Sequence, residues 1–348
     1  MKKKCRFVGI MFLCIIIVCT VLVMIYERAT NNNTKEKENF TVVTSFYPMY
    51  IAALNIVDGA DGVTLENLSE PQTGCLHDFQ LTPEDMKLLS TADLFVINGG
   101  GIESFMSDVA KAYPDLTVVE ACKNVELINE SEEDVDTHDH DHEADSDETD
   151  HDHDNEADSD ETDHDHETDS DESGHDHDHG DENAHAWMSV ARYRVMVSTI
   201  AESLSKADPS NAAIYDSNAK KYDAKLAELE EKENEIKQKT AGNDIIIFHE
   251  AYEYVADDFG MNVCYLMDLD EERAVSAGEV SDVINAVRND GVSVILAEEL
   301  YGKDLGDTVS RETDVKMVYI DPLNRGNYDK NSYIEGMEKN FELIEAAF

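Results

Sequence analysis

Short apolar segments rich in β-branched residues alternate with segments of helical period along most of this chain. The predicted strands lie at residues 41–44, 63–68, 94–97, 116–119, 245–248, 263–266, 292–296 and 316–320. Predicted helices lie at residues 51–57, 83–89, 102–112 and 331–347. Strands that alternate with helices indicate parallel sheets. We therefore predict an α/β protein with two parallel-sheet α/β lobes, one before and one after the middle of the chain.

A single long helix is predicted between the two sets of strands. Asp208-Pro209-Ser210 has the form of an N-cap followed by proline in the first turn, and helix-forming residues continue to about Lys239. One side of this helix is apolar and includes Ile214, Tyr222, Leu226 and Leu229. Such a stripe suits packing against the lobes better than a coiled coil. The predicted organisation is an N-terminal lobe at 40–207, a linker helix at 208–240 and a C-terminal lobe at 241–348.

The first 28 residues are predicted to be an export signal or membrane anchor. Four basic residues precede an uncharged apolar run from Phe7 to Tyr26, which in a helix approaches the ~30 Å hydrocarbon core of a bilayer. The small residues of a cleavage site are missing, so an uncleaved anchor with a polar tether at 29–39 is favoured over a cleaved signal, which would give a secreted protein. Lipidation is a further alternative, although Cys14 and Cys19 follow large residues. The basic flank places the remainder outside the cytoplasmic membrane.

Charge and cysteine content narrow the possible functions. The formal net charge is −50, and 28 of the 77 acidic residues lie between Glu130 and Glu182, where Lys and Arg are absent. The remainder is also acidic, which argues against nucleic acid or an anionic membrane surface as a partner and favours cations. After the N-terminal segment the chain contains only Cys75, Cys122 and Cys264, which allow at most one internal disulfide.

Ten of the 13 histidines lie within the acidic segment, in H-D-H repeats with a period of 13 residues. They are His138, His140, His142, His151, His153, His164, His166, His175, His177 and His179. Low hydrophobicity and high charge predict a disordered His/Asp-rich loop at 130–183, inserted in the N-terminal lobe. A solubilising or calcium-binding tract would need only aspartate, so the histidines favour accessory capture of a transition metal such as zinc.

The other three histidines are candidates for a specific metal site. His77 lies in the loop after the second predicted strand, and His249 directly follows the fifth. Asp321 directly follows the last strand. Ligand sites in parallel α/β sheets open at the carboxyl ends of strands, which is where these residues lie. His185 comes just after the acidic loop, at the start of a predicted helix that carries Trp187.

The ligand types favour zinc over manganese. Three imidazoles and one carboxylate suit tetrahedral Zn²⁺, whereas Mn²⁺ prefers more oxygen ligands, and affinity alone would also admit copper or nickel. Glu298 and Glu299, which also follow a strand, are rivals to Asp321 for the carboxylate position. Cys75 is a possible soft ligand near His77.

Several segments around these residues resemble the metal-binding receptors of ABC importers, specifically the zinc and manganese cluster. The matching segments are 43–48 (VTSFYP), 77–83 (HDFQLTP), 92–94 (ADL), 185–188 (HAWM), 248–252 (FHEAY) and 319–323 (YIDPL). The resemblance spans about residues 39–348 apart from the acidic loop. It implies two α/β lobes joined by a long backbone helix, with one metal ion in the interlobe cleft.

The resemblance also implies which residues bind the metal. Positions that match the family's motifs are His77, His185, His249 and Asp321. A His-rich acidic loop at this place is typical of the zinc-specific members. The stretch at residues 181–184 (DENA) departs from the Asp-Pro-His that usually includes the histidine corresponding to His185.

The predicted function is therefore extracytoplasmic capture of Zn²⁺ and its delivery to an ABC permease and its ATPase, without enzymatic activity. A manganese receptor of the same family and a metal buffer or adhesin are alternatives. A zinc hydrolase with Glu250 as general base is another, but it would need an open coordination position. We expect a monomer that contacts no nucleic acid and meets the membrane only through its N-terminal anchor.

Overall fold

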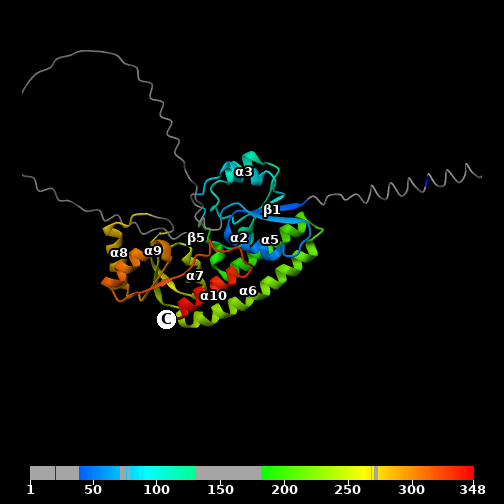
Figure 1. The fold of residues 1–348 in the computed structure, drawn as a ribbon. Helices are drawn as coiled ribbons and strands as arrows, with labels where there is room; N and C mark the ends of the chain where they lie inside the picture. The colour runs from blue at the N-terminus through cyan, green and yellow to red at the C-terminus, as the bar shows by residue number, and fades with distance from the viewer. Residues whose placement is uncertain are drawn as a thin grey trace, which may run out of the picture.

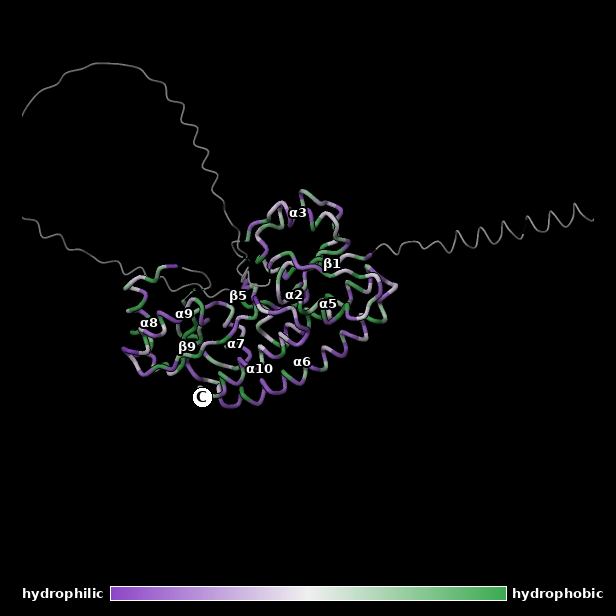
Figure 2. Tube along the Cα trace, viewed as in Figure 1, coloured by the Kyte–Doolittle hydropathy of each residue, from purple (hydrophilic) through white to green (hydrophobic). Residues whose placement is uncertain are grey.

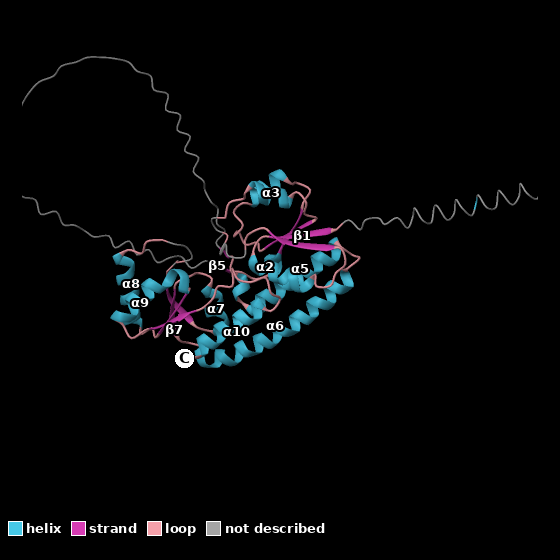
Figure 3. Ribbon diagram, in the orientation of Figure 1, coloured by secondary structure: helices cyan, strands magenta, loops and turns pink. Residues whose placement is uncertain are grey.

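The computed structural model describes residues 39–70, 76, 79–129, 182–267, 269 and 273–348, together with Thr20. These residues form two α/β lobes, each built on a four-stranded parallel sheet (Figure 3), and this confirms the predicted fold class. Within the described ranges, every helix is too short or too polar to cross a membrane. The predicted anchor at 1–28 lies outside them except for Thr20.

The N-terminal lobe has the strand order β2-β1-β3-β4. Its elements are β1 (Phe40–Thr44), α2 (Tyr47–Ile56), β2 (Val63–Asn67), α3 (Pro83–Leu89), β3 (Leu94–Ile97), α4 (Met106–Ala112), β4 (Thr117–Glu120) and the short 3₁₀ helix η1 (Ala121–Asn124). Thr82 and Asp85 form a capping box that begins α3. The predicted helix at 102–112 is shorter than expected, since it begins at Met106.

The C-terminal lobe repeats this topology with the order β8-β7-β9-β10. Its elements are β7 (Asp244–Ile247), α7 (Tyr252–Phe259), β8 (Asn262–Leu266), α8 (Ala277–Asp290), β9 (Val294–Ala297), α9 (Glu299–Glu312), β10 (Lys316–Tyr319) and α10 (Ser332–Glu345). Gly260 and Gly291 end α7 and α8 in the left-handed conformation that glycine adopts without strain. In both lobes the first strand lies inside the sheet, so the strand order reverses beside β1 and β7, where α/β proteins bind ligands.

Two helices that the sequence analysis placed differently connect the lobes. The predicted helix around Trp187 is only the 3₁₀ turn η2 (Ala186–Met188), and the long α5 (Val190–Ala207) starts after Ser189, whose hydroxyl caps it. The linker helix α6 (Ala212–Thr240) begins later than predicted. Asp208 is not its N-cap, because its carboxylate accepts hydrogen bonds from residues of the turn between α5 and α6. Figure 1 shows α6 along one edge of the molecule, next to α2 and α5 at one end and α10 at the other.

The described part of the predicted acidic loop is not all irregular. Ile128–Asn129 (β5) and Glu182–Asn183 (β6) pair as a short antiparallel ribbon at its two ends. The last two residues of the predicted disordered segment are therefore a strand, because ladder hydrogen bonds and burial of Asn183 hold them in place. The ten histidines of this segment lie outside the described residues.

A second connection between the lobes follows β10 and leads to α10. Its Tyr328 ring packs on Tyr50 of α2, with ring centroids 4.0 Å apart. Lys330 forms an ion pair with Asp58 (2.5 Å), and Tyr47 donates a hydrogen bond to the Asn327 carbonyl (2.8 Å). The residues after β10 are thereby fixed to the N-terminal lobe.

Apolar residues concentrate in the sheets and on the inner sides of the covering helices (Figure 2). One core extends from the N-terminal sheet through α5 and α6 to β7 and α10. A second core lies between the C-terminal sheet and helices α8 and α9. In α6, Tyr222, Leu226 and Leu229 are buried as the apolar stripe predicted, while Tyr215 rather than Ile214 is the buried residue of the first turns. Burial along α6 thus joins the N-terminal lobe and the α10 side of the C-terminal lobe in one core.

Candidate metal centre

Two buried histidines from different lobes lie next to each other. His249 follows β7 at the carboxyl edge of the C-terminal sheet, and His185 lies between β6 and η2 on the N-terminal lobe. Their ring centroids are 5.1 Å apart, with the ring planes at 75°, and neither ring is exposed to solvent. Because Zn–N bonds are about 2.0–2.1 Å long, rings at this separation can share one ion.

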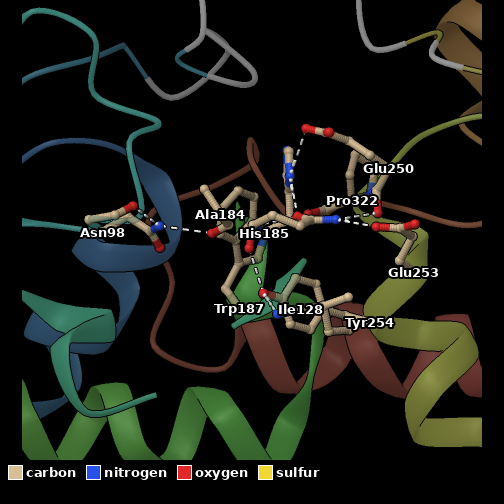
Figure 4. Close-up of polar contacts among 11 residues, drawn as sticks. Asn98, Ile128, Ala184, His185, Trp187, Glu250, Glu253, Tyr254 and Pro322 are labelled. Atoms are coloured by element: carbon tan, nitrogen blue, oxygen red, sulfur yellow. Dashed lines mark hydrogen bonds and ion pairs between the residues drawn. The ribbon is translucent and has the colours of Figure 1, made fainter. Parts of the chain in front are cut away.

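The environment of His185 determines which ring nitrogen can bind a metal. Its Nδ1 lies 3.0 Å from Asn183 Oδ1 and 3.2 Å from Glu250 Oε1. Figure 4 shows Glu250 and Glu253 on one side of His185 and Asn98 on the other. In a neutral imidazole, a nitrogen between two oxygen acceptors carries the hydrogen, and the lone pair is then on Nε2. His185 is thereby prepared to ligate through Nε2.

Glu250 has a different role from the one that a hydrolase would require. Its carboxylate faces the His185 imidazole at 3.2 Å. A carboxylate that accepts from a ligating histidine orients the ring and raises its basicity as a ligand. The geometry of Glu250 therefore fits support of His185 better than proton abstraction from a water.

The residues on either side of Asp321 are hydrogen-bonded to aromatic side chains that pack on the two histidines. The Tyr252 hydroxyl donates to the Ile320 carbonyl (2.8 Å), and the Trp187 indole donates to the Pro322 carbonyl (2.8 Å). Each of these aromatic rings also contacts one of the two histidines, with centroids 5.5 and 4.9 Å apart. The peptides on either side of Asp321 are thus fixed to residues that pack on the histidine pair.

Asp321 as a whole residue is exposed to solvent, although protein atoms surround part of its carboxyl group. Its Oδ1 accepts a hydrogen bond from the Leu323 amide (2.8 Å), and its own amide donates to Asn340 Oδ1 (2.8 Å). Desolvation raises the pKa of the Asp321 carboxyl, while the hydrogen bond from the Leu323 amide and the charge of Arg325 lower it. The side chain also lines a cavity of about 650 Å³. A bound cation would offset the cost of keeping this carboxylate charged.

The two rival carboxylates are engaged elsewhere. Glu298 lines the same cavity as Asp321 but is buried in an ion pair with Arg325. Glu299 is mostly exposed and pairs with Lys303 on the next turn of α9 (2.7 Å). Both rival carboxylates are thus paired with cations, and the choice of Asp321 as the carboxylate ligand stays a prediction.

The remaining predicted ligands are not placed. His77 and Cys75 lie outside the described residues, as do the histidines of the acidic segment. Among the residues that the structure does describe, no group of three or more His, Cys, Asp and Glu side chains is arranged to hold a metal ion. The structure brings His185 and His249 together, and the complete four-ligand set stays a prediction. Sequence reasoning missed Asn183 as a partner of His185, although its departure from the family's usual aspartate was visible.

Comparison with known proteins identifies the family. A family profile described as "Zinc-uptake complex component A periplasmic" matches residues 42–347. The chain belongs to this family. The match includes both lobes, α6 and every candidate ligand, so the resemblance predicted from the sequence motifs is confirmed.

Individual relatives cover the chain to different extents. The zinc-binding protein AdcA of Streptococcus pyogenes is 30% identical over 315 residues, which are 87% of this chain and 55% of that protein. The chain thus spans about half the length of AdcA. The high-affinity zinc uptake system protein ZnuA of Bacillus subtilis is 26% identical over 339 residues and is matched over 95% of each chain. A solved structure of FpvC from Pseudomonas aeruginosa with Ni²⁺ has a TM-score of 0.67 at 22% identity, covering 89% of this chain and 96% of that one, and shows the same fold.

Proposed function

We propose that this chain is an extracytoplasmic receptor that captures Zn²⁺ between its lobes and delivers it to the permease of an ABC importer. The observation that carries the proposal is the buried pair of His185 and His249, contributed by different lobes of a zinc-uptake family member. Two imidazoles that meet only across the interface let one ion join the lobes. The permease would then recognise the metal-loaded arrangement.

The proposed ligand set is His77, His185, His249 and Asp321. Three nitrogen ligands and one carboxylate favour tetrahedral Zn²⁺, and manganese remains the second choice because it prefers oxygen ligands. Four protein ligands would leave no open position for a reacting water, which fits transport rather than hydrolysis. In this proposal the histidines of residues 130–181 supply weaker accessory sites that raise the local concentration of zinc.

Competitive titration of the full chain tests this proposal. The metal-free protein is titrated with zinc and with manganese against a chromophoric chelator. We expect one tight zinc equivalent, several weaker ones and weak manganese binding. His249→Ala should abolish the tight equivalent, whereas the matched control His164→Ala, in the acidic segment, should leave it intact. A tight zinc equivalent that survives His249→Ala would refute the interlobe site.

The proposed partners and location can be tested separately. With its cognate permease and ATPase, the receptor should be required for zinc-dependent ATP hydrolysis, and His249→Ala should remove the stimulation. Fractionation of cells should place the chain on the outer side of the cytoplasmic membrane. We propose an anchor at residues 1–28 and a monomeric receptor, which sedimentation of the purified protein would check.

A further inference from the structure

The side chain of Asn183 is fully buried. Asn183 lies just after the segment 130–181 and two residues before His185. Its backbone is fixed by pairing of β6 with β5. The Tyr254 hydroxyl donates to the Asn183 carbonyl (2.5 Å), and the Asn98 amide donates to the next carbonyl along the chain (2.9 Å). Residue 183 is therefore held by both lobes, since β5 and Asn98 belong to the N-terminal lobe and Tyr254 to α7.

The Asn183 amide uses all of its hydrogen-bonding capacity. Its Nδ2 donates to the Glu250 carbonyl and to Glu253 Oε2, each at 2.9 Å. Its Oδ1 accepts from the His185 backbone amide and lies 3.0 Å from His185 Nδ1. The opposite amide orientation would place an NH₂ group against a backbone N–H and an oxygen against two acceptors. Only one orientation is compatible with these neighbours.

We propose that Asn183 is a positioning residue for metal binding, which holds His185 as the Nδ1–H tautomer with Nε2 directed to the ion. This inference rests on the proposed function, in which His185 is a ligand. The outer hydrogen bond of a metal-binding histidine fixes its tautomer and ring orientation, and its loss typically lowers metal affinity 10–100-fold. Because Asn183 also bonds Glu250 and Glu253, it joins the histidine of one lobe to α7 of the other.

The chemistry at this position requires an amide rather than a carboxylate. Glu253 is 6% exposed, and its Oε2 accepts a hydrogen bond from Asn183 Nδ2. An aspartate here would place two carboxylate oxygens about 2.9 Å apart in a buried site, where like charges repel strongly. Exchange of the two groups, with Asp at 183 and Gln at 253, would restore a donor between them.

The test uses the full chain with the substitutions Asn183→Ala, Asn183→Asp and the pair Asn183→Asp with Glu253→Gln. We expect Asn183→Ala to weaken the tight zinc equivalent by about 10–100-fold in chelator competition. Long-range ¹H–¹⁵N spectra of the metal-free protein should show His185 as the Nδ1–H tautomer in the wild type and as a mixture in the alanine variant. A purely structural role would not change the tautomer.

A matched control separates this effect from the loss of a buried amide. Asn211 is also a buried asparagine, in the turn between α5 and α6, and Asn211→Ala should leave zinc affinity and the His185 tautomer unchanged. Wild-type affinity and tautomer in Asn183→Ala would overturn the positioning role. If Asn183→Ala does not fold, the double variant Asn183→Asp with Glu253→Gln decides the question. Tighter zinc binding by the double variant than by Asn183→Asp alone supports the inference. Equal binding by the two overturns it.

The outcomes also separate this inference from the proposed function. If His249→Ala binds zinc as tightly as the wild type, the interlobe site itself is wrong. If His249→Ala loses the tight equivalent while Asn183→Ala keeps it, only the role of Asn183 is wrong.

Discussion

Glu233 on α6 is a buried carboxyl group that should make the free energy of unfolding depend on pH. It is 5% exposed, and burial, followed by the nearby Asp258 carboxyl, raises its pKa from 4.5 to about 8. Asp258 of α7 is bonded to Arg192 of α5 at 3.2 Å. Burial raises the pKa of Asp258 as well, to about 6. The two connecting helices α5 and α6 and helix α7 of the C-terminal lobe therefore meet at this pair of carboxyl groups.

The sign of the effect follows from proton binding. A raised pKa means that the folded state holds a proton that the unfolded state releases, so stability decreases as the pH rises. For Glu233 the loss begins near pH 4.5 and ends near pH 8. Each pH unit within that window costs up to ~1.4 kcal/mol. Between pH 5 and pH 7.5 the contribution of Glu233 falls by about 3 kcal/mol.

Replacement of Glu233 by Gln removes this titration with little change in volume. Urea unfolding at pH 5, 6, 7 and 7.5 gives the free energy of unfolding of both proteins. We expect the variant to gain about 3 kcal/mol relative to the wild type between pH 5 and pH 7.5. The difference between the two curves cancels other titrating groups such as Glu103, whose pKa burial raises to about 7.

The control is Glu231→Gln, which removes an exposed carboxylate two positions away on the same helix. Its curve should run parallel to that of the wild type. If the curve of Glu233→Gln is also parallel to the wild type, the carboxyl group of Glu233 is ionised at neutral pH in the folded state and the reasoning is wrong.

Three further predictions concern the lobe connections and the acidic segment. Trp187→Phe should cost about 1–3 kcal/mol in urea unfolding, because the buried Pro322 carbonyl loses its donor, and an unchanged midpoint would contradict this. Gly326→Ala should lower the thermal midpoint, since φ is +148° and a Cβ atom would lie 2.7 Å from Tyr47 Oη. A melting curve identical to that of the wild type would show that the segment between β10 and α10 moves freely. Deletion of residues 130–181 should reduce the number of bound zinc ions and spare the tight one, and loss of the tight one would make that segment the principal site.

Most of the elements of this fold were predictable because their signals are local. The strand Leu94–Ile97 and the helix Pro83–Leu89 have the predicted bounds. Short apolar β-branched runs and a Thr82 cap are properties of neighbouring residues. His249 and Asp321 could be recognised as candidates for the same reason, since each lies two residues after the end of a strand.

Errors arose where side-chain hydrogen bonds formed within a folded turn override a local signal. Asp208 resembles an N-cap, but the Tyr215 hydroxyl and the Asn211 amide bind its carboxylate and delay the helix by almost a turn. The 3₁₀ turn after His185 ends at Ser189, whose hydroxyl caps α5 instead. These outcomes depend on packing of the finished turn, which the order of residues alone does not specify.

The sequence by itself determined the parallel α/β class, the two sets of strands and the residue types able to bind zinc. Hydrophobic periodicity and side-chain chemistry depend only on the order of residues. Only the tertiary structure decided which groups face one another. It placed His185 between Asn183 and Glu250, which lie 67 residues apart, and paired Glu298, the rival of Asp321 in the sequence, with Arg325. Contacts of this kind depend on how the lobes pack across α6, and hydrogen bonding in a buried site selects among partners that the sequence leaves equivalent.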